Sequence, residues 1–133
     1  MDQIVNAALD NRWGILIQDS EYKTPDASSG SNFSISLINN DTVEIKTSGG
    51  TNIEIHRVAF AEVLKYLLTN NHTLENKCAI GSNKDISKAG QLCRVARNAN
   101  GINIMIINYL VPLLEKMSLV SISSDRPNSV WLV

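Results

Sequence analysis

Leu110-Val-Pro-Leu-Leu-Glu-Lys-Met-Ser-Leu-Val-Ser-Ile122 carries the strongest structural signal in this sequence. Its first half is apolar up to Glu115 and Lys116, which predicts the end of a buried helix. Residues 119–123 then alternate as a strand. Residues 125–128, Asp-Arg-Pro-Asn, predict a turn, and residues 129–133 predict a returning strand. We therefore expect the chain to close with a helix followed by a β-hairpin.

Upstream of this hairpin, the pattern predicts three helices, with a short strand between the first and the second. The predicted helices are residues 57–70, 85–98 and 102–117, and the predicted strand is residues 78–80. In the first helix Phe60, Leu64 and Leu67 fall on one stripe. Asp85 or Ser87 can cap the second helix through a side-chain oxygen. Residues 98–101, Asn-Ala-Asn-Gly, predict a tight turn before the third.

The N-terminal part predicts an antiparallel β-meander. Residues 32–37, 42–47 and 51–56 alternate with period two, and Asn-Asn-Asp and Ser-Gly-Gly turns separate them. Residues 1–10 are weakly helical at best, and the apolar run 12–18 predicts a further strand. Residues 24–31 predict a polar loop. The apolar face of the meander must cover something, and the helices that follow are the obvious candidate.

The order of elements after the meander resembles the winged helix-turn-helix DNA-binding superfamily over about residues 57–133. Residues 110–122 are similar to the third helix and first wing strand of bacterial members, with Ser118 where those families usually have glycine. The turn 125–128 resembles the wing tip, and residues 130–132 the returning strand. The resemblance implies an α+β fold with two parts. An N-terminal antiparallel β-meander, residues 1–56, would pack beside a C-terminal winged helix made of three helices and a hairpin wing.

Charge is divided unevenly along the chain. Residues 1–56 carry eight acidic and three basic side chains, whereas residues 77–116 carry six basic and two acidic ones. Such a split is typical of a nucleic-acid surface on the basic part, and equally of two parts that attract each other.

The resemblance implies a cytoplasmic DNA-binding protein, a small bacterial- or phage-type transcription regulator. Its expected partner is double-stranded DNA, and a homodimer or a protein partner is left open. Basic side chains would contact phosphates and carboxamides would contact base edges. The candidate nucleic-acid-binding residues are Lys84, Lys88, Gln91, Arg94, Arg97, Asn98, Asn100, Asn103 and Arg126. The purely structural interpretation is that the asparagines cap helices or form turns, and that the cations belong to a solvent-exposed helix face.

The outer face of the predicted helix 102–117 is unusually apolar for a DNA-reading helix. Met105, Ile106, Tyr109 and Leu113 lie on the stripe that would face DNA. A stripe of this kind usually marks an interface. The alternative hypothesis is therefore a winged-helix protein-interaction module, such as an adapter, inhibitor or subunit of a larger complex. The N-terminal sheet, a second copy of the chain and another protein are the possible covers.

No catalytic site, metal or cofactor is expected. Cys78 and Cys93 are too few for a zinc site and predict buried small hydrophobes. Glu44 and Glu54 fall on the solvent face of the meander, where cross-strand pairing with Lys46 explains them. No apolar run approaches the ~18 residues of a membrane span, and no secretory signal is expected at the start.

Overall fold

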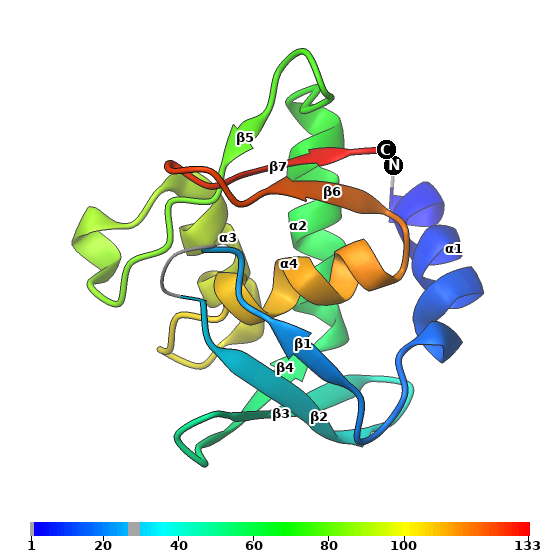
Figure 1. Cartoon of the computed structure of the whole chain (residues 1–133). Helices are drawn as coiled ribbons and strands as arrows, with labels where there is room; N and C mark the ends of the chain where they lie inside the picture. Colours follow the sequence, from blue (N-terminus) through cyan, green and yellow to red (C-terminus); the bar gives the residue numbers. More distant parts are fainter. Residues whose placement is uncertain (1, 27–29) are drawn as a thin grey trace.

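The computed structural model describes residues 2–26 and 30–133, and this part of the chain has a mixed α+β fold (Figure 1). Its strands form one four-stranded and one three-stranded sheet. The elements in chain order are α1 (Asp2–Arg12), the 3-10 turn η1 (Trp13–Ile15), β1 (Glu21–Lys23), β2 (Asn32–Ile38), β3 (Thr42–Thr47), β4 (Asn52–His56), α2 (Arg57–Thr69), β5 (Cys78–Ala79), the 3-10 turn η2 (Ile86–Lys88), α3 (Gln91–Asn100), α4 (Ile107–Lys116), β6 (Val120–Ser123) and β7 (Ser129–Leu132).

The four-stranded sheet is the predicted meander with β1 added at its edge. Its order is β1-β2-β3-β4, with each neighbouring pair antiparallel. The register places Ile35 opposite Ile45 and Ile45 opposite Ile53, and all three side chains are buried. The period-two alternation therefore builds one apolar face, because alternate side chains leave a strand on opposite sides. The predicted strands at residues 32–37, 42–47 and 51–56 are confirmed.

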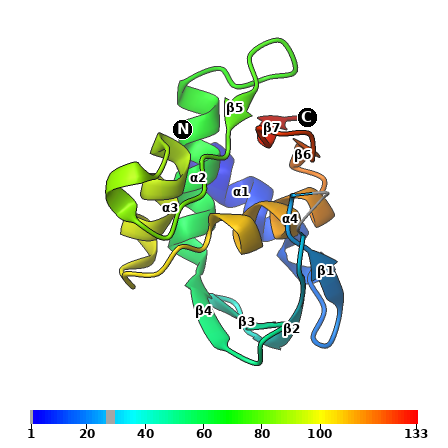
Figure 2. The ribbon, with the colours of Figure 1, turned by 60° about the vertical axis from the view of Figure 1, so that its left-hand side comes forward.

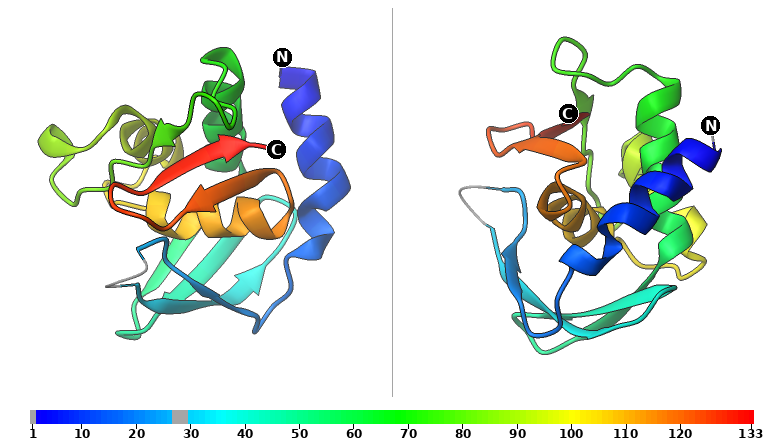
Figure 3. Two further views of the ribbon diagram at one scale, coloured as in Figure 1. Left: turned by 45° about the horizontal axis from the view of Figure 1, so that its top comes forward. Right: turned by 90° about the vertical axis from the view of Figure 1, so that its right-hand side faces the viewer.

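The N-terminus departs from the prediction, because residues 2–12 form helix α1 and residues 12–18 are not a strand. Val5 and Leu9 are buried on the inner side of α1, which packs across α2 (Figure 3). Trp13 and Leu16 continue this buried row at helical spacing. The Trp13 indole Nε1 donates to the Asn39 backbone oxygen at 2.7 Å. Tertiary packing thus stabilises a helix whose own sequence signal is weak.

The predicted loop 24–31 lies partly outside the described residues, since 27–29 are not among them. Its two described ends are joined directly. The Thr24 amide donates to the Ser31 carbonyl at 2.9 Å, and the Ser31 amide donates to the Thr24 hydroxyl at 2.8 Å.

The second half of the chain contains the predicted helices and strands with shifted boundaries. The predicted helix 57–70 and the strands at 78–80, 119–123 and 129–133 are present as α2, β5, β6 and β7. In the three-stranded sheet the order is β5-β7-β6, with β7 antiparallel to both neighbours.

The predicted helix 85–98 is wrong at both ends. The Asp85 carboxylate accepts from the Ser87 amide at 3.0 Å, but it caps the short turn η2 rather than a long helix. The chain is then extended at Gly90, whose amide donates to the Gly81 carbonyl at 2.8 Å. These two glycine backbones approach so closely that a Cβ on Gly81 would lie 2.8 Å from the Gly90 Cα. Helix α3 therefore begins only at Gln91.

Helix α3 continues through the predicted turn 98–101 and ends at Asn100. Gly101 follows in the left-handed region with φ 72°, a conformation that commonly terminates helices at glycine. The predicted third helix, 102–117, is also too long, because α4 begins at Ile107. Residues 102–106 form an irregular connection between α3 and α4.

Helix α4 lies between the two sheets (Figures 1 and 2). Its buried side chains point to both sides, and they are Ile107, Leu110, Val111, Pro112, Leu113 and Leu114. Tyr109 packs edge-on against Phe33 of β2, with ring centroids 5.3 Å apart. One hydrophobic cluster includes residues of both halves of the chain. The N-terminal sheet is thus the cover of the apolar α4 face, which explains how a helix can be apolar on nearly every side.

Among the described residues, no helix combines the length and the apolar character needed to cross a lipid bilayer.

Candidate nucleic-acid interface

Three candidate cations lie together on residues 84–94, which we call the basic segment. Lys84 and Lys88 are exposed, and Arg94 is half-buried. The Arg94 guanidinium donates from Nε to the Ala89 carbonyl at 3.0 Å and from Nη2 to the Ser87 carbonyl at 3.0 Å. These bonds hold its charge beside η2. Within residues 2–26 and 30–133, no carboxylate lies within ion-pair distance of these three side chains.

Asp85 is the acidic residue of the basic segment. Hydrogen bonds from the Ser87 hydroxyl and amide, together with the nearby Arg97 charge, lower the pKa of this carboxyl below its usual range. Asp85 therefore carries a negative charge at neutral pH. With Lys84, Lys88 and Arg94, the segment keeps a positive excess.

The acidic side chains of the N-terminal part pair with cations outside the basic segment. Asp10 contacts Arg57, and the Asp2 carboxylate lies 3.1 Å from the Lys65 Nζ, so two pairs join α1 to α2. The charge split along the chain is thus partly neutralised within the fold, but away from the basic segment.

Two predicted nucleic-acid contacts are buried and serve the fold. Arg97 is 7% exposed and donates from Nε to the Asn103 Oδ1 at 3.0 Å, from Nη1 to the Lys84 carbonyl at 2.9 Å and from Nη2 to the Asn103 carbonyl at 3.2 Å. Asn100 is 3% exposed, and it accepts from the His56 amide at 2.7 Å and donates to the Glu54 carbonyl at 3.0 Å. Both side chains are thus engaged within the fold, which does not favour the predicted contact of either with the backbone or base edges of a duplex.

The remaining carboxamides lie on the surface. Gln91 and Asn98 are exposed on α3, and with Arg94 they follow the three- and four-residue spacing of one helix face. Asn103 is exposed as a residue, although its Oδ1 accepts from Arg97. Gln91 therefore lies within the basic segment, and Asn98 extends it along α3.

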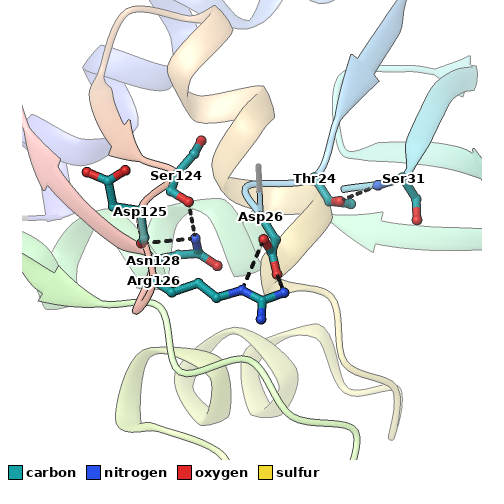
Figure 4. A network of polar contacts seen from close by, with 7 residues as sticks. All are labelled: Thr24, Asp26, Ser31, Ser124, Asp125, Arg126 and Asn128. Atoms are coloured by element: carbon teal, nitrogen blue, oxygen red, sulfur yellow. Dashed lines mark hydrogen bonds and ion pairs between the residues drawn. The ribbon is translucent and has the colours of Figure 1, made fainter. Parts of the chain in front are cut away.

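Arg126 is held by the N-terminal part rather than projecting freely. Figure 4 shows its guanidinium against Asp26, with Nη2 2.8 Å from Oδ2 and Nε 3.4 Å from Oδ1. The Asn128 Nδ2 donates to the Ser124 and Asp125 carbonyls at 3.0 and 3.3 Å, which shapes the same turn. A phosphate would have to compete with the Asp26 carboxylate for this arginine.

The predicted protein-contact surface on the third helix is largely absent. Ile106 and Leu113 are fully buried, because the N-terminal sheet covers this face. Met105 and Tyr109 are partly buried and pack on the core. Ile106 and Leu113 are therefore not available to a partner protein, and the N-terminal sheet, one of the three covers that the sequence left open, lies on this face.

The sequence reasoning missed a pocket beside the basic segment. It has a volume of about 480 Å³ and lies between the β3–β4 turn and the connection from α3 to α4. Lys84 and Arg97 line it together with hydroxyl side chains of the turn. The sequence signal for it was the pair Lys84 and Arg97. A helix wheel cannot place these two cations in one cavity, because Lys84 lies outside helix α3.

Comparison with protein-family models, curated protein sequences and solved structures gives no match to this chain. The proposals below therefore rest on geometry and charge alone.

Proposed function

We propose that this protein binds double-stranded DNA, with residues 57–132 arranged as a winged helix. The order helix, strand, helix, helix, strand, strand supports this assignment. So does the sheet order β5-β7-β6, in which the strand before α3 pairs with the last strand of the hairpin. In this assignment α4 takes the place of the recognition helix, and residues 125–128 take the place of the wing turn.

The proposed DNA contact is unusual for that architecture, because α4 is covered. Winged-helix proteins normally insert this helix into the major groove. Here Leu113 and Ile106 are fully buried and Tyr109 packs against Phe33 of the N-terminal sheet, so the apolar face of α4 is not available to DNA. We place the contact on η2 and α3 instead, with Lys84, Lys88 and Arg94 on the phosphate backbone. Such contacts position a protein on the duplex without reading its sequence.

The observation that carries this proposal is the lack of carboxylate partners around the basic segment. Arg57, Lys65 and Arg126 each have an aspartate within ion-pair distance. Lys84, Lys88 and Arg94 have none among the described residues, and their positive potential remains available to a polyanion. Gln91 and Asn98 add hydrogen-bonding groups on the adjoining face of α3.

The test is a fluorescence-polarisation titration of the whole chain with a labelled duplex at two salt concentrations. With about three phosphate contacts, affinity should fall roughly 40-fold between about 50 and about 200 mM salt, from counterion release. Lys88→Ala should weaken binding and flatten the slope of log affinity against log salt by about one unit.

Lys116→Ala is the matched control, because this exposed lysine at the end of α4 removes the same charge outside the basic segment. It should change affinity much less than Lys88→Ala. The proposal is wrong if the duplex does not bind at low salt, or if both variants weaken binding equally.

A further inference from the structure

The pocket beside α3 is formed by parts of the chain that are distant in sequence, and Ser31 and Asn32 at the start of β2 also line it. One wall comes from the turn between β3 and β4, with the side chains of Thr47, Ser48 and Thr51. The other comes from the α3–α4 connection, with Ile104 and Met105. Its volume of about 480 Å³ falls in the range of small-molecule sites, roughly 300–1,000 Å³. A ligand of this size would therefore touch both the N-terminal sheet and the helical part.

The charged side chains that line this pocket, among the described residues, are both cations. Lys84 and Arg97 line it, and no aspartate or glutamate is among its described lining residues. Hydroxyl and carboxamide groups make up much of the remaining polar surface. A cavity with two cations and several hydrogen-bond donors attracts a negatively charged group.

Arg97 is the more informative of the two cations, because it is 93% buried and yet no carboxylate of the described chain lies within ion-pair distance of it. Three of its N–H groups donate to neutral oxygens, those of Lys84 and Asn103. A guanidinium has five such groups, so two have no acceptor among the described residues. The Asp85 carboxylate is near enough for the Arg97 charge to lower its pKa, but it does not accept a hydrogen bond from the guanidinium. An anionic ligand would supply acceptors for the two remaining N–H groups.

A purely structural role explains only part of this arrangement. The bonds from Arg97 to Asn103 fix the α3–α4 connection, which is reason enough for the arginine to be buried. They do not explain why Lys84 lines the same cavity, or why the hydroxyl side chains of a distant hairpin turn face it.

We propose that this pocket binds a small organic oxyanion, a phosphate or carboxylate group carried on an apolar body. Arg97 and Lys84 contact the anionic group, because a planar guanidinium donates two parallel hydrogen bonds to such oxygens. Thr47, Ser48 and Thr51 supply further hydrogen bonds, and Ile104, Met105 and Tyr109 contact the apolar body. This site shares Lys84 with the DNA contact proposed above, whereas Lys88 and Arg94 belong to the DNA contact alone.

The test is an NMR titration of the ¹⁵N-labelled full chain with phenyl phosphate and benzoate, with phenol as the neutral probe. We expect saturable shifts confined to the amides of the pocket-lining segments, residues 31–32, 47–53, 84, 97 and 103–109, for at least one anion, and none for phenol. Whichever anion binds more tightly identifies the head group.

Lys84→Ala should weaken anion binding roughly tenfold, the loss of one charge-assisted hydrogen bond. Arg97→Lys keeps the charge but loses the planar fork, and should weaken it further. Lys84 is exposed, so its variant tests the site even if Arg97→Lys does not fold. Lys88→Ala should leave anion binding unchanged while weakening DNA binding, which separates this inference from the proposed function.

The inference is overturned if neither anion gives saturable shifts, or if the shifts lie outside the pocket-lining segments. It is equally overturned if phenol binds as tightly as the anions, or if Lys84→Ala binds them like the wild type.

Discussion

Replacing Asn100 by alanine should destabilise the protein more than any other change to an asparagine on α3. Strand β4 is an edge of the first sheet, so its outward backbone groups have no neighbouring strand. The Asn100 side chain makes the hydrogen bonds that a neighbouring strand would make: it accepts from the His56 amide and donates to the Glu54 carbonyl. The carboxamide therefore joins the N-terminal sheet to α3 through two hydrogen bonds.

The size of the effect follows from what the alanine leaves behind. Two backbone groups lose their partner in a site where Asn100 is almost fully buried. Each unsatisfied buried group costs about 1–3 kcal/mol, and water entering from the strand edge would reduce that. We expect a loss of about 3 kcal/mol in the free energy of unfolding. For a chain of this length that lowers the melting temperature by roughly 10 °C.

The assay is urea unfolding followed by far-UV circular dichroism, with a thermal scan beside it. Asn98→Ala is the matched control, since Asn98 is exposed on the same helix. An exposed substitution of this kind should stay within about 0.5 kcal/mol of the wild type. The reasoning is refuted if Asn100→Ala and Asn98→Ala have the same unfolding midpoint, because the buried carboxamide would then contribute nothing.

Two further predictions concern a glycine contact and a buried thiol. Gly81→Ala should destabilise the fold by about 1 kcal/mol or more beyond Gly101→Ala in urea unfolding. Both residues have positive φ, but only a Cβ at position 81 would meet the backbone, because it would lie 2.8 Å from the Gly90 Cα. Equal losses of unfolding free energy in the two variants would contradict this clash. Burial raises the pKa of the Cys78 thiol from its usual value of 9.0 to about 11. The folded state then keeps a proton that the unfolded state releases, so this thiol lowers stability as pH rises from about 9 to about 11. Urea midpoints measured across that range should fall less in Cys78→Ser than in the wild type, and identical pH profiles would contradict the assignment.

The meander was predictable because its signal is local. Alternation of Val43 with Ile45 and of Ile53 with Ile55 marks two strands, and Ser48-Gly-Gly50 marks the turn between them. A β-strand needs little more than this, since the period of two and the turn residues fix both its face and its partner.

Helix α1 was missed because its signal is long-range. Val5, Leu9, Trp13 and Leu16 all bury their side chains, but their spacing spans the helix, the turn η1 and the residue after it. The exposed Ile15 and Ile17 fill the gaps and make the run look like a strand. What stabilises α1 is its contact with α2, and a window of ten residues does not contain that contact.

The candidate site was predicted only where exposure follows from local sequence. Lys84, Lys88, Gln91 and Asn98 are exposed, as a polar helix face predicts. The burial of Arg97 and Asn100 depends on the α3–α4 connection and on the edge of β4, respectively. Neither neighbour can be placed from the helix wheel, so their role in holding the fold emerged only from the structure.

The position of α4 between two sheets limits how this chain can be exchanged between proteins during evolution. A recognition helix with one apolar stripe can be moved with its own three-helix unit, because that unit covers the stripe. Helix α4 needs the meander as well, since Tyr109 packs against Phe33 of β2 and Leu113, one turn further on, is fully buried. A gene fragment encoding residues 57–133 alone would expose this apolar surface and favour self-association. The two halves therefore depend on each other for folding, and a fusion that keeps residues 57–133 should keep the meander with them.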